Sequence, residues 1–270
     1  MKNSIITLLS DFGTKDHYVA SMKGTILRIN PGCTLVDITH HVNAHDVEEG
    51  AFLLGNAYCS FPKGTVHLAV VDPGVGGPRR PLLLVTPDHF FVGPDNGLFT
   101  LVLMREKLRM AVTPTDQKFF LPRVSHTFHG RDLFAPVAAH LSLGVKPEAF
   151  GPQIDSWFEL DFPKPIIERG RLSGEVIHID RFGNLITNVT EKELARFSKG
   201  RSLTVTIGRR KIQSLKKGYW EGKRNEAMAL VGSGGFLEIS VKEGSAQKLL
   251  KINRGDPVQV SPRSQAANSK

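Results

Sequence analysis

Four loops of this 270-residue chain gather carboxylates, guanidinium groups and imidazoles, the side chains that bind polar ligands and move protons. The first loop, SDFGTKDHY over residues 10–18, follows an apolar, β-branched run. A carboxylate at the carboxyl end of a parallel strand, such as Asp11, can accept hydrogen bonds from both hydroxyls of a ribose. The structural alternatives are a local turn around Asp11 and a helix N-cap at Asp16.

The second loop, DPGVGGPRR over residues 72–80, places an aspartate and two arginines around three glycines. Glycine allows the backbone to approach a ligand closely. The loop lacks the Gly-Lys-Ser/Thr ending of a phosphate-binding Walker loop. An ion pair between Asp72 and a following arginine would by itself only hold the loop together, so this loop alone does not establish a function.

The third loop, SHTFHGRD over residues 125–132, opens a predicted helix. Histidine and arginine at a helix N-terminus favour the binding of an anion or a polar substrate. The alternative is that Asp132 caps the helix and pairs with Arg131. His126 and His129 have a spacing that also suits zinc, but the sequence offers no clear third ligand. We therefore predict no metal site.

The fourth loop, HIDRFGNLITN over residues 178–188, lies in the second half of the chain. Phe182 can stack on a flat ring while the amide of Asn184 bonds to the edge of that ring. The alternative is a β-turn in which Asp180 and Asn184 satisfy backbone groups. The residues alone do not separate the two interpretations.

The elements that carry these loops change character along the chain. Up to about residue 150, strands alternate with helices, which predicts an α/β domain with a largely parallel sheet. The predicted strands are 4–10, 33–39, 64–71, 81–86 and 89–93, and the predicted helices are 16–29, one capped by Asp46, 96–106 and 132–143. Beyond residue 170 the strands are short, and only 191–198 has a clear helical pattern. The predicted strands there are 173–179, 185–189, 202–207, 227–231, 236–241 and 257–260.

This change predicts two domains joined by a proline-rich linker. We expect an N-terminal α/β domain over residues 1–150 and a linker over 151–170. A small β-rich domain, a barrel or a sandwich, follows over 171–262, and residues 263–270 form a frayed tail.

Composition narrows the class of protein. The chain is 40% hydrophobic and 23% charged, which is typical of a soluble globular protein. Two cysteines exclude a disulfide scaffold and a four-thiolate zinc site. We find no signal peptide and no apolar run long enough to span a membrane, and expect a cytoplasmic protein. The net charge of +9 and ten basic residues within 196–224 raise nucleic acid as a partner. We favour a solvated surface, because no aromatic-rich RNA-binding signature accompanies these charges.

Six motifs, taken together and in order, resemble one family. SDFGTKDHYV, VVDPGVGGPRR, FVGPDNG, TFHGRDLFAP, IDRFGNLITN and GSGGFLEI are similar to motifs of the S-adenosyl-L-methionine hydroxide adenosyltransferases, relatives of bacterial fluorinases and chlorinases. The resemblance runs from about Ile5 to Val260. It implies an N-terminal α/β domain, a C-terminal β-barrel domain and a homotrimer. The substrate would lie between the N-domain of one subunit and the C-domain of its neighbour.

The reaction implied by the resemblance is attack of water or hydroxide on the ribose 5′ carbon of S-adenosyl-L-methionine, giving adenosine and methionine without a metal or redox cofactor. The family's catalytic residues fall on Asp72, Arg79 and His129. Its ligands for the ribose, the methionine part and the adenine fall on Asp11, Asp16, Asp180, Phe182, Asn184 and Ser233. Arg80 is an alternative to Arg79, and the base is either Asp72 or His129.

Three other functions compete with hydrolysis. A halogenase shares the scaffold, but Gly130 stands at the halide-binding serine of those relatives, and Ser233-Gly234 lacks their arginine. A methyltransferase ranks third, because the chain lacks the glycine-rich first loop that is typical of the methyltransferase fold. A non-catalytic sensor of adenosine or S-adenosyl-L-methionine belongs to a different class, and analysis of the reaction products would separate it from the enzymes.

Overall fold

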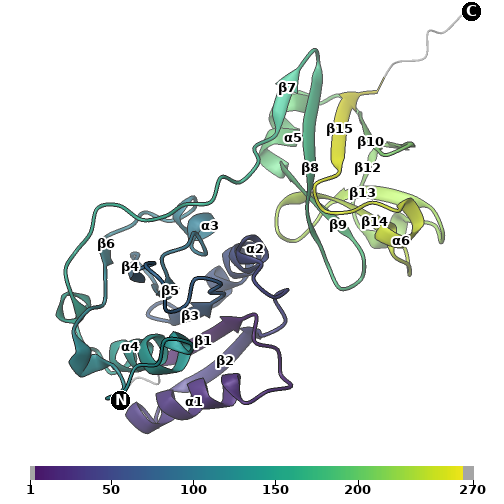
Figure 1. Ribbon diagram of the computed structural model, residues 1–270. Coiled ribbons are helices and arrows are strands. Elements are labelled where there is room, and N and C mark those ends of the chain that lie inside the picture. Colours follow the sequence, from purple (N-terminus) through teal and green to yellow (C-terminus); the bar gives the residue numbers. More distant parts are fainter. Residues whose placement is uncertain (1–3, 264–270) are drawn as a thin grey trace, which may run out of the picture. The chain divides into compact units, whose positions relative to one another are not determined.

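The computed structural model describes residues 4–263 and divides the chain after Leu160 into two compact units (Figure 1). The division falls inside the predicted linker, residues 151–170. Of the predicted tail, only Arg263 is described. Its backbone N–H donates to the carbonyl of Ser202 at 2.8 Å, and the rest of the tail lies outside the described residues.

A six-stranded sheet forms the centre of the N-terminal unit, in the order β2-β1-β3-β5-β4-β6 (Figure 1). The strands β2, β1, β3 and β5 run parallel, whereas β4 is antiparallel to both β5 and β6. The largely parallel sheet predicted from the sequence is therefore confirmed. The reversal follows from the tight turn between β4 and β5, where Thr86 N–H donates to the His89 carbonyl at 3.0 Å, because a short turn can join only antiparallel strands. The strands are β1 (Ile5–Ser10), β2 (Thr34–Thr39), β3 (Val66–Val70), β4 (Pro81–Val85), β5 (Phe90–Pro94) and β6 (Met110–Val112).

Helices cover both faces of this sheet, because successive side chains of a strand point to opposite faces. Ile6 and Leu8 of β1 lie in the cluster that includes residues of α1 (Tyr18–Ile29) and α4 (Ala135–Ser142). Leu9 lies in the second cluster, with residues of α2 (Val47–Ala57) and α3 (Thr100–Leu103). The helix α3 is shorter than the predicted 96–106, and a π-helical turn over Gly130–Phe134 precedes α4.

The predicted helix caps have different outcomes. The Asp46 carboxylate accepts the Glu49 N–H at 2.9 Å, so it caps α2 as predicted. The N-cap of α1 is His17 and makes no side-chain cap bond, so the suggested Asp16 cap is wrong. Asp132 does not cap a helix either. It lies inside the π-helical turn and pairs with Arg131.

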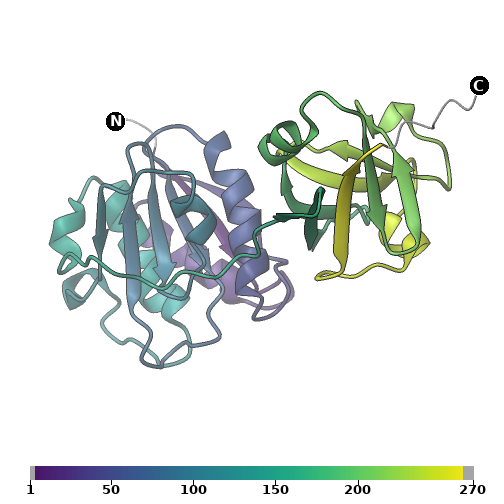
Figure 2. The same ribbon diagram turned by 90° about the horizontal axis from the view of Figure 1, so that it is seen from above.

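A nine-stranded sheet forms the C-terminal unit, along the path β11-β10-β15-β8-β9-β14-β13-β12 with β7 on β8. The strands β11 and β13, from the two ends of this path, contact each other, so the sheet is a nearly closed barrel (Figure 2). This confirms the β-barrel predicted for the second half. The strands are β7 (Ile166–Glu168), β8 (Arg171–Ile179), β9 (Leu185–Thr190), β10 (Leu203–Ile207), β11 (Arg210–Gln213), β12 (Leu215–Lys216), β13 (Ala227–Val231), β14 (Phe236–Val241) and β15 (Pro257–Pro262).

Two α-helices accompany the barrel. The predicted helix is α5 (Glu191–Ser198), and Thr190 and Glu193 form a capping box at its start. The helix α6 (Ala246–Leu250) was not predicted, because a single turn and a half shows no clear period. No helix within residues 4–263 has the length and apolar character that a membrane span needs.

Candidate active site

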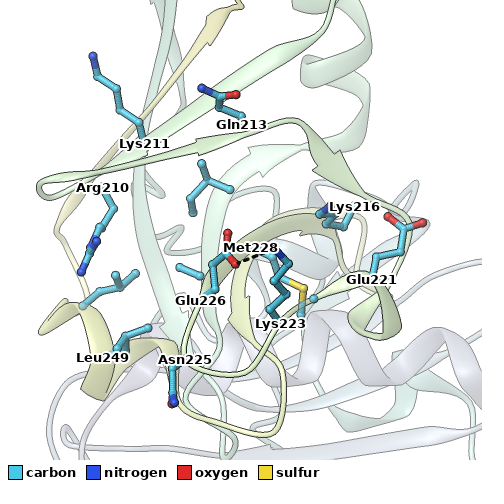
Figure 3. Close-up of a pocket in the computed structure, with 14 residues that line it drawn as sticks. Arg210, Lys211, Gln213, Lys216, Glu221, Lys223, Asn225, Glu226, Met228 and Leu249 are labelled. Atoms are coloured by element: carbon cyan, nitrogen blue, oxygen red, sulfur yellow. Dashed lines mark ion pairs between the residues drawn. The ribbon is translucent and has the colours of Figure 1, made fainter.

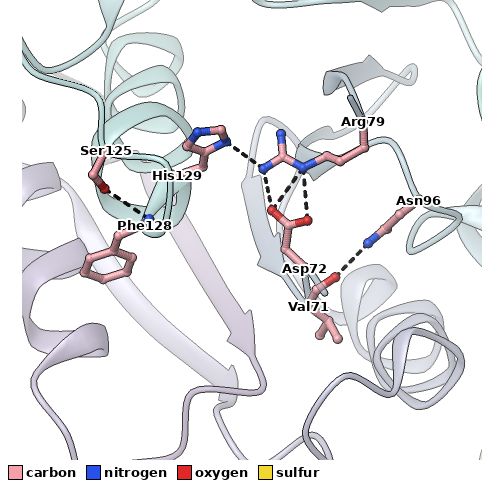
Figure 4. Close-up of polar contacts among 7 residues, drawn as sticks. All are labelled: Val71, Asp72, Arg79, Asn96, Ser125, Phe128 and His129. Atoms are coloured by element: carbon pink, nitrogen blue, oxygen red, sulfur yellow. Dashed lines mark hydrogen bonds and ion pairs between the residues drawn. The ribbon is translucent and has the colours of Figure 1, made fainter. Parts of the chain in front are cut away.

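Asp72, Arg79 and His129 meet beyond the carboxyl end of β3 (Figure 4). Arg79 Nε donates to both carboxylate oxygens of Asp72, at 3.0 Å and 3.1 Å, and Nη2 donates to Oδ2. The same Nη2 lies 2.8 Å from His129 Nδ1. The Asp72 and Arg79 side chains are only 4% and 10% exposed. The guanidinium group therefore joins a carboxylate and an imidazole in a place with little access to water.

The glycine-rich loop brings Arg79 to His129. Gly76 has a φ of +76°, a conformation that favours glycine. A Cβ atom at Gly76 would lie 2.1 Å from the His126 carbonyl oxygen. The second and third loops therefore contact each other through their backbones, and only glycine fits at this contact. On the other side of Asp72, Asn96 Nδ2 holds the Val71 carbonyl at 2.8 Å (Figure 4).

The third loop is held in place by its own hydrogen bonds. Ser125 Oγ accepts the Phe128 N–H at 3.1 Å (Figure 4), and the Asp132 carboxylate accepts the Ser125 N–H at 2.9 Å. Asp132 also pairs with the Arg131 guanidinium, as the structural alternative predicted. On the far side of the site, the Arg79 guanidinium lies 5.2 Å from the centre of the Phe134 ring. The contact between His129 and Arg79 is thus supported on both sides, by the hydrogen bonds of the third loop and by the ring beside Arg79.

The protonation state of His129 follows from its partner. A guanidinium group has no acceptor, so Arg79 Nη2 donates and His129 Nδ1 accepts. The proton of the neutral imidazole is therefore on Nε2. Burial, and then the charge of Arg79, lower the pKa of His129 below its ordinary value. At neutral pH His129 therefore offers an Nε2–H donor.

Arg80 has a different set of partners. Its Nε and Nη2 donate to Asp95 Oδ2 at 3.0 Å and 2.7 Å, and Nη2 donates to the Ser156 carbonyl at 2.9 Å. Asp95 Oδ1 in turn accepts the Phe158 N–H at 2.7 Å. Arg80 thus fastens the segment 156–158 to the sheet, and Arg79 is the arginine that contacts Asp72 and His129.

Asp11 lies at the same edge of the sheet as Asp72. Each follows its strand, and Ser10 of β1 pairs with Val70 of β3. Asp11 Oδ2 accepts the His45 N–H at 2.9 Å. Its other oxygen has no hydrogen-bond partner among residues 4–263 and is open to a ligand. Asp16 is exposed in the loop before α1.

The remaining predicted residues lie in the C-terminal unit. Asp180 Oδ1 accepts the backbone N–H groups of Phe182 and Asn184, both at 2.9 Å, and Oδ2 accepts Asn184 Nδ2 at 2.8 Å. The turn predicted as the structural alternative for Asp180 and Asn184 is therefore present, and their part in substrate binding stays a prediction. Phe182 is 75% exposed at the tip of this turn, and Ser233 is exposed in the turn between β13 and β14.

Sequence reasoning did not single out Glu238, which lies in the GSGGFLEI motif. Glu238 is only 6% exposed, although a charged side chain is seldom so buried. The signal for it is the alternation in β14, where Leu237 and Ile239 lie in the core and Glu238 points to the other face.

The described residues contain no group of three or more His, Cys, Asp or Glu side chains arranged to hold a metal ion. A cavity of about 460 Å³ in the C-terminal unit (Figure 3) gathers part of the basic segment 196–224. It contains none of the predicted site residues, and acids offset part of its positive charge. The charged side chains around it are Arg210, Lys211, Lys216, Lys223, Glu221 and Glu226.

Comparison with known proteins gives a consistent result. Residues 6–151 match the SAM hydroxide adenosyltransferase N-terminal domain, and residues 174–259 match the C-terminal domain of that family. An (R)-S-adenosyl-L-methionine hydrolase of Thermus thermophilus is 38% identical, with 94% of this chain and 98% of that protein covered. One of Methanocaldococcus jannaschii is 36% identical, with 95% of both covered. A fluorinase of Nocardia brasiliensis is 26% identical, with 96% and 97% covered. The crystal structure of an uncharacterized conserved protein from Thermotoga maritima has a TM-score of 0.89 at 36% identity, with 95% and 99% covered.

Proposed function

The chain belongs to the SAM hydroxide adenosyltransferase family, and we propose that it hydrolyses S-adenosyl-L-methionine to adenosine and L-methionine. Water or hydroxide attacks the ribose 5′ carbon. The similarity over nearly the whole chain to proteins named as hydrolases carries this proposal. The buried contact of Asp72, Arg79 and His129 supports a site in the N-terminal unit that acts on the nucleophile.

The chemistry of the substrate decides what this site must do. The leaving group departs from a sulfonium as a neutral thioether, so it needs no general acid. Water is a weak nucleophile, and a permanent positive charge favours hydroxide. We assign this role to Arg79. His129 Nε2–H donates a hydrogen bond to the attacking oxygen, while Asp72, which retains free lone pairs, accepts the proton.

The binding residues come from both units. Asp11 holds the ribose hydroxyls with its unoccupied oxygen. Phe182 stacks on the adenine, and Asp180 and Asn184 hold the turn that presents this ring. Asp16 and Ser233 lie near the methionine part. The enzyme works as a cytoplasmic homotrimer in which two neighbouring subunits complete each site, as the family resemblance implies.

The surroundings of Gly130 leave little space for a side chain. A Cβ atom at this glycine would lie 3.2 Å from Met22 Sδ and 3.4 Å from ring carbons of Phe12 and Phe128. A serine hydroxyl, which the halogenating relatives carry there, therefore has little room. This observation favours hydrolysis over halogenation.

Product analysis tests the reaction. The protein is incubated with S-adenosyl-L-methionine with and without chloride, and the products are separated by chromatography. We expect adenosine and L-methionine in equal amounts under both conditions. A halo-adenosine would show a halogenase, and binding without turnover would show a sensor.

A further inference from the structure

A buried hydrogen bond joins the start of the first loop to the end of β2. His40 Nδ1 lies 2.7 Å from Ser10 Oγ, and both side chains are at most 3% exposed. Ser10 is the last residue of β1 and directly precedes Asp11, whereas His40 directly follows β2. The proposed mechanism uses neither side chain. Because both are buried, the pair can act only through the backbone that it holds.

The loop after β2 holds the first loop at two further points. The His40 carbonyl accepts the Gly13 N–H at 2.7 Å, and the His45 N–H donates to Asp11 Oδ2 at 2.9 Å. The three contacts between the loops therefore involve residues before, at and after Asp11. Together they fix the position of its carboxylate, one oxygen of which is open to a ligand.

A shift in register between β1 and β2 places His40 beside Ser10. The register of the parallel pair advances by one residue between Leu8 and Leu9, so that Leu9 pairs with Thr39. The next residues along the two strands are Ser10 and His40. Without the extra residue in β2, Thr39 would lie beside Ser10. An extra residue of this kind changes the direction of the side chains that follow it.

Asp37 determines which nitrogen of His40 carries the proton. His40 Nε2 lies 3.1 Å from Asp37 Oδ1, and Lys23 Nζ of α1 donates to Asp37 Oδ2 at 2.6 Å. Burial lowers the pKa of His40, so its imidazole is neutral at neutral pH. Nε2 makes no aligned hydrogen bond among the described residues, so the charge of Asp37 is what stabilises its proton. Nδ1 is therefore an acceptor for the Ser10 hydroxyl, and Ser10 Oγ accepts the Phe12 N–H at 3.4 Å.

We propose that Ser10 and His40 are positioning residues, which hold the Asp11 carboxylate where it meets the ribose hydroxyls and so make the site selective for a ribonucleoside. This inference rests on the proposed function, in which Asp11 holds the ribose. The ribose hydroxyls take no part in the reaction, so the pair stabilises ground state and transition state equally. Loss of the pair should therefore change KM and nucleoside affinity and leave kcat nearly unchanged.

The test compares the binding of adenosine and 2′,3′-dideoxyadenosine, which differ only in the ribose hydroxyls, by calorimetry. We expect the wild type to bind adenosine about 100-fold more tightly, the effect of two hydrogen bonds to a charged group. Ser10→Ala removes the buried hydroxyl and should weaken adenosine binding about 10-fold, while the affinity for dideoxyadenosine stays the same. KM for S-adenosyl-L-methionine should rise by the same factor as the dissociation constant of adenosine.

Thr7→Val is the matched control, because it removes a similar hydroxyl from the same strand. Thr7 Oγ1 lies 2.8 Å from His67 Nδ1, and both side chains are fully buried. This pair joins neighbouring positions of β1 and β3 inside the sheet rather than a loop. Thr7→Val should lower the Tm, as Ser10→Ala does, and leave the preference for adenosine unchanged.

Two substitutions of His40 give an independent measurement. His40→Asn keeps an acceptor close to the position of Nδ1, whereas His40→Ala removes it. We expect His40→Asn to retain most of the preference for adenosine and His40→Ala to lose as much of it as Ser10→Ala.

An unchanged preference in Ser10→Ala and His40→Ala, or an equal loss of affinity for both nucleosides, would overturn the proposal. So would an equal fall of the preference in Thr7→Val. Absence of hydrolysis by the wild type would instead contradict the proposed function, and the two affinities would still decide the role of the pair. A wild type that shows no preference for adenosine would overturn the roles of Asp11 and of the pair together.

Discussion

At the scale of the residue, His129 accepts a hydrogen bond from the guanidinium group of Arg79, which has donors and no acceptor. This fixes the proton on Nε2, away from Arg79. The sequence alone left the base open between Asp72 and His129. The hydrogen-bond direction supports our proposal that Asp72 accepts the proton and that His129 donates to the nucleophile.

The lowered pKa of His129 predicts the acid side of the pH profile. Protonation would put a second positive charge beside Arg79 and would remove the Nδ1 acceptor. Activity is therefore lost as the pH falls through the lowered pKa, below the ordinary value of 6.5. We expect kcat/KM to stay level down to that pH and to decline only below it. The same linkage makes the free energy of unfolding fall as the pH drops from the ordinary pKa of 6.5 to the lowered pKa of His129, because in that range the unfolded chain binds the proton more readily.

A pH–rate profile of the wild type measures this decline of kcat/KM at low pH directly. Arg79→Gln removes the neighbouring charge and should move the His129 titration, followed by NMR, to higher pH. The role given to His129 would be contradicted if kcat/KM of the wild type already declined above pH 6.5, or if the His129 titration did not move in the variant.

The two adjacent arginines make a matched pair for mutation. Arg79→Ala should lower kcat about 10²- to 10⁴-fold, the usual effect of losing a charge-stabilising group. Arg79→Lys should restore little of the lost kcat, because one ammonium group cannot replace a planar guanidinium group that donates to both Asp72 and His129. Arg80→Ala loses the contacts to Asp95 and Ser156, so it should lower the Tm and leave kcat near normal.

Measuring kcat and Tm on all three variants separates catalysis from loop stability. If the Asp72–Arg79 pair only held its loop together, Arg79→Ala would lower the Tm while turnover stayed normal. That result would refute the proposed mechanism.

At the scale of the element, neighbouring parallel strands explain why the site lies where it does. The carboxyl ends of β1 and β3 meet at one edge, which brings Asp11 and Asp72 to the same place. The alternation of strands and helices predicted this edge from the sequence. It did not predict the contact between Arg79 and His129, which are 50 residues apart, because periodicity carries no information about which loops meet. The family resemblance supplied that pairing.

Some elements were not predicted, or were predicted with other bounds, for local reasons. The strands β7, β11 and β12 are two to four residues long, too short to show an alternating pattern. The helix α1 begins later than predicted, and the loop before it is held elsewhere, with Gly13 N–H donating to the His40 carbonyl at 2.7 Å. Asp16 therefore lies in the loop before α1. The prediction that it caps the helix rested only on the preference of aspartate for that position.

Gly76 tests the contact between the second and third loops. Gly76→Ala adds a methyl group 2.1 Å from the His126 carbonyl, so the loops must separate and Arg79 must move from His129. We expect turnover to fall at least about 10²-fold, because catalytic geometry tolerates little displacement. Gly64→Ala is the control, since Gly64 also has a positive φ of +88° but nothing lies within 4 Å of its Cβ position. It should cost about 1 kcal/mol of stability and leave kcat unchanged. Equal loss of activity in both variants would contradict the role given to this contact.

At the scale of the whole molecule, the proposed site residues are divided between two units with separate cores. The N-terminal unit contains Asp11, Asp72, Arg79 and His129, and the C-terminal unit contains Phe182 and Ser233. Neither unit therefore contains both the groups proposed to act on the nucleophile and the ring proposed to stack on the adenine. The sequence predicted the two units from the change in strand length and proline content. How subunits complete a site follows only from the resemblance and requires its own experiment.

Mixing two inactive variants tests whether neighbouring subunits share a site. Asp11→Ala removes the proposed ribose ligand in one unit, and Phe182→Ala removes an exposed ring in the other. Phe182 is the better choice than Asp180, whose loss would disturb the turn itself. In a ring that assembles at random from equal amounts, about a quarter of the shared sites combine two intact halves. Unfolding and refolding the variants together should therefore restore about a quarter of the wild-type activity, while each refolded alone stays inactive. If each site formed within one chain, every site would contain one defect, and the mixture would remain as inactive as its parts.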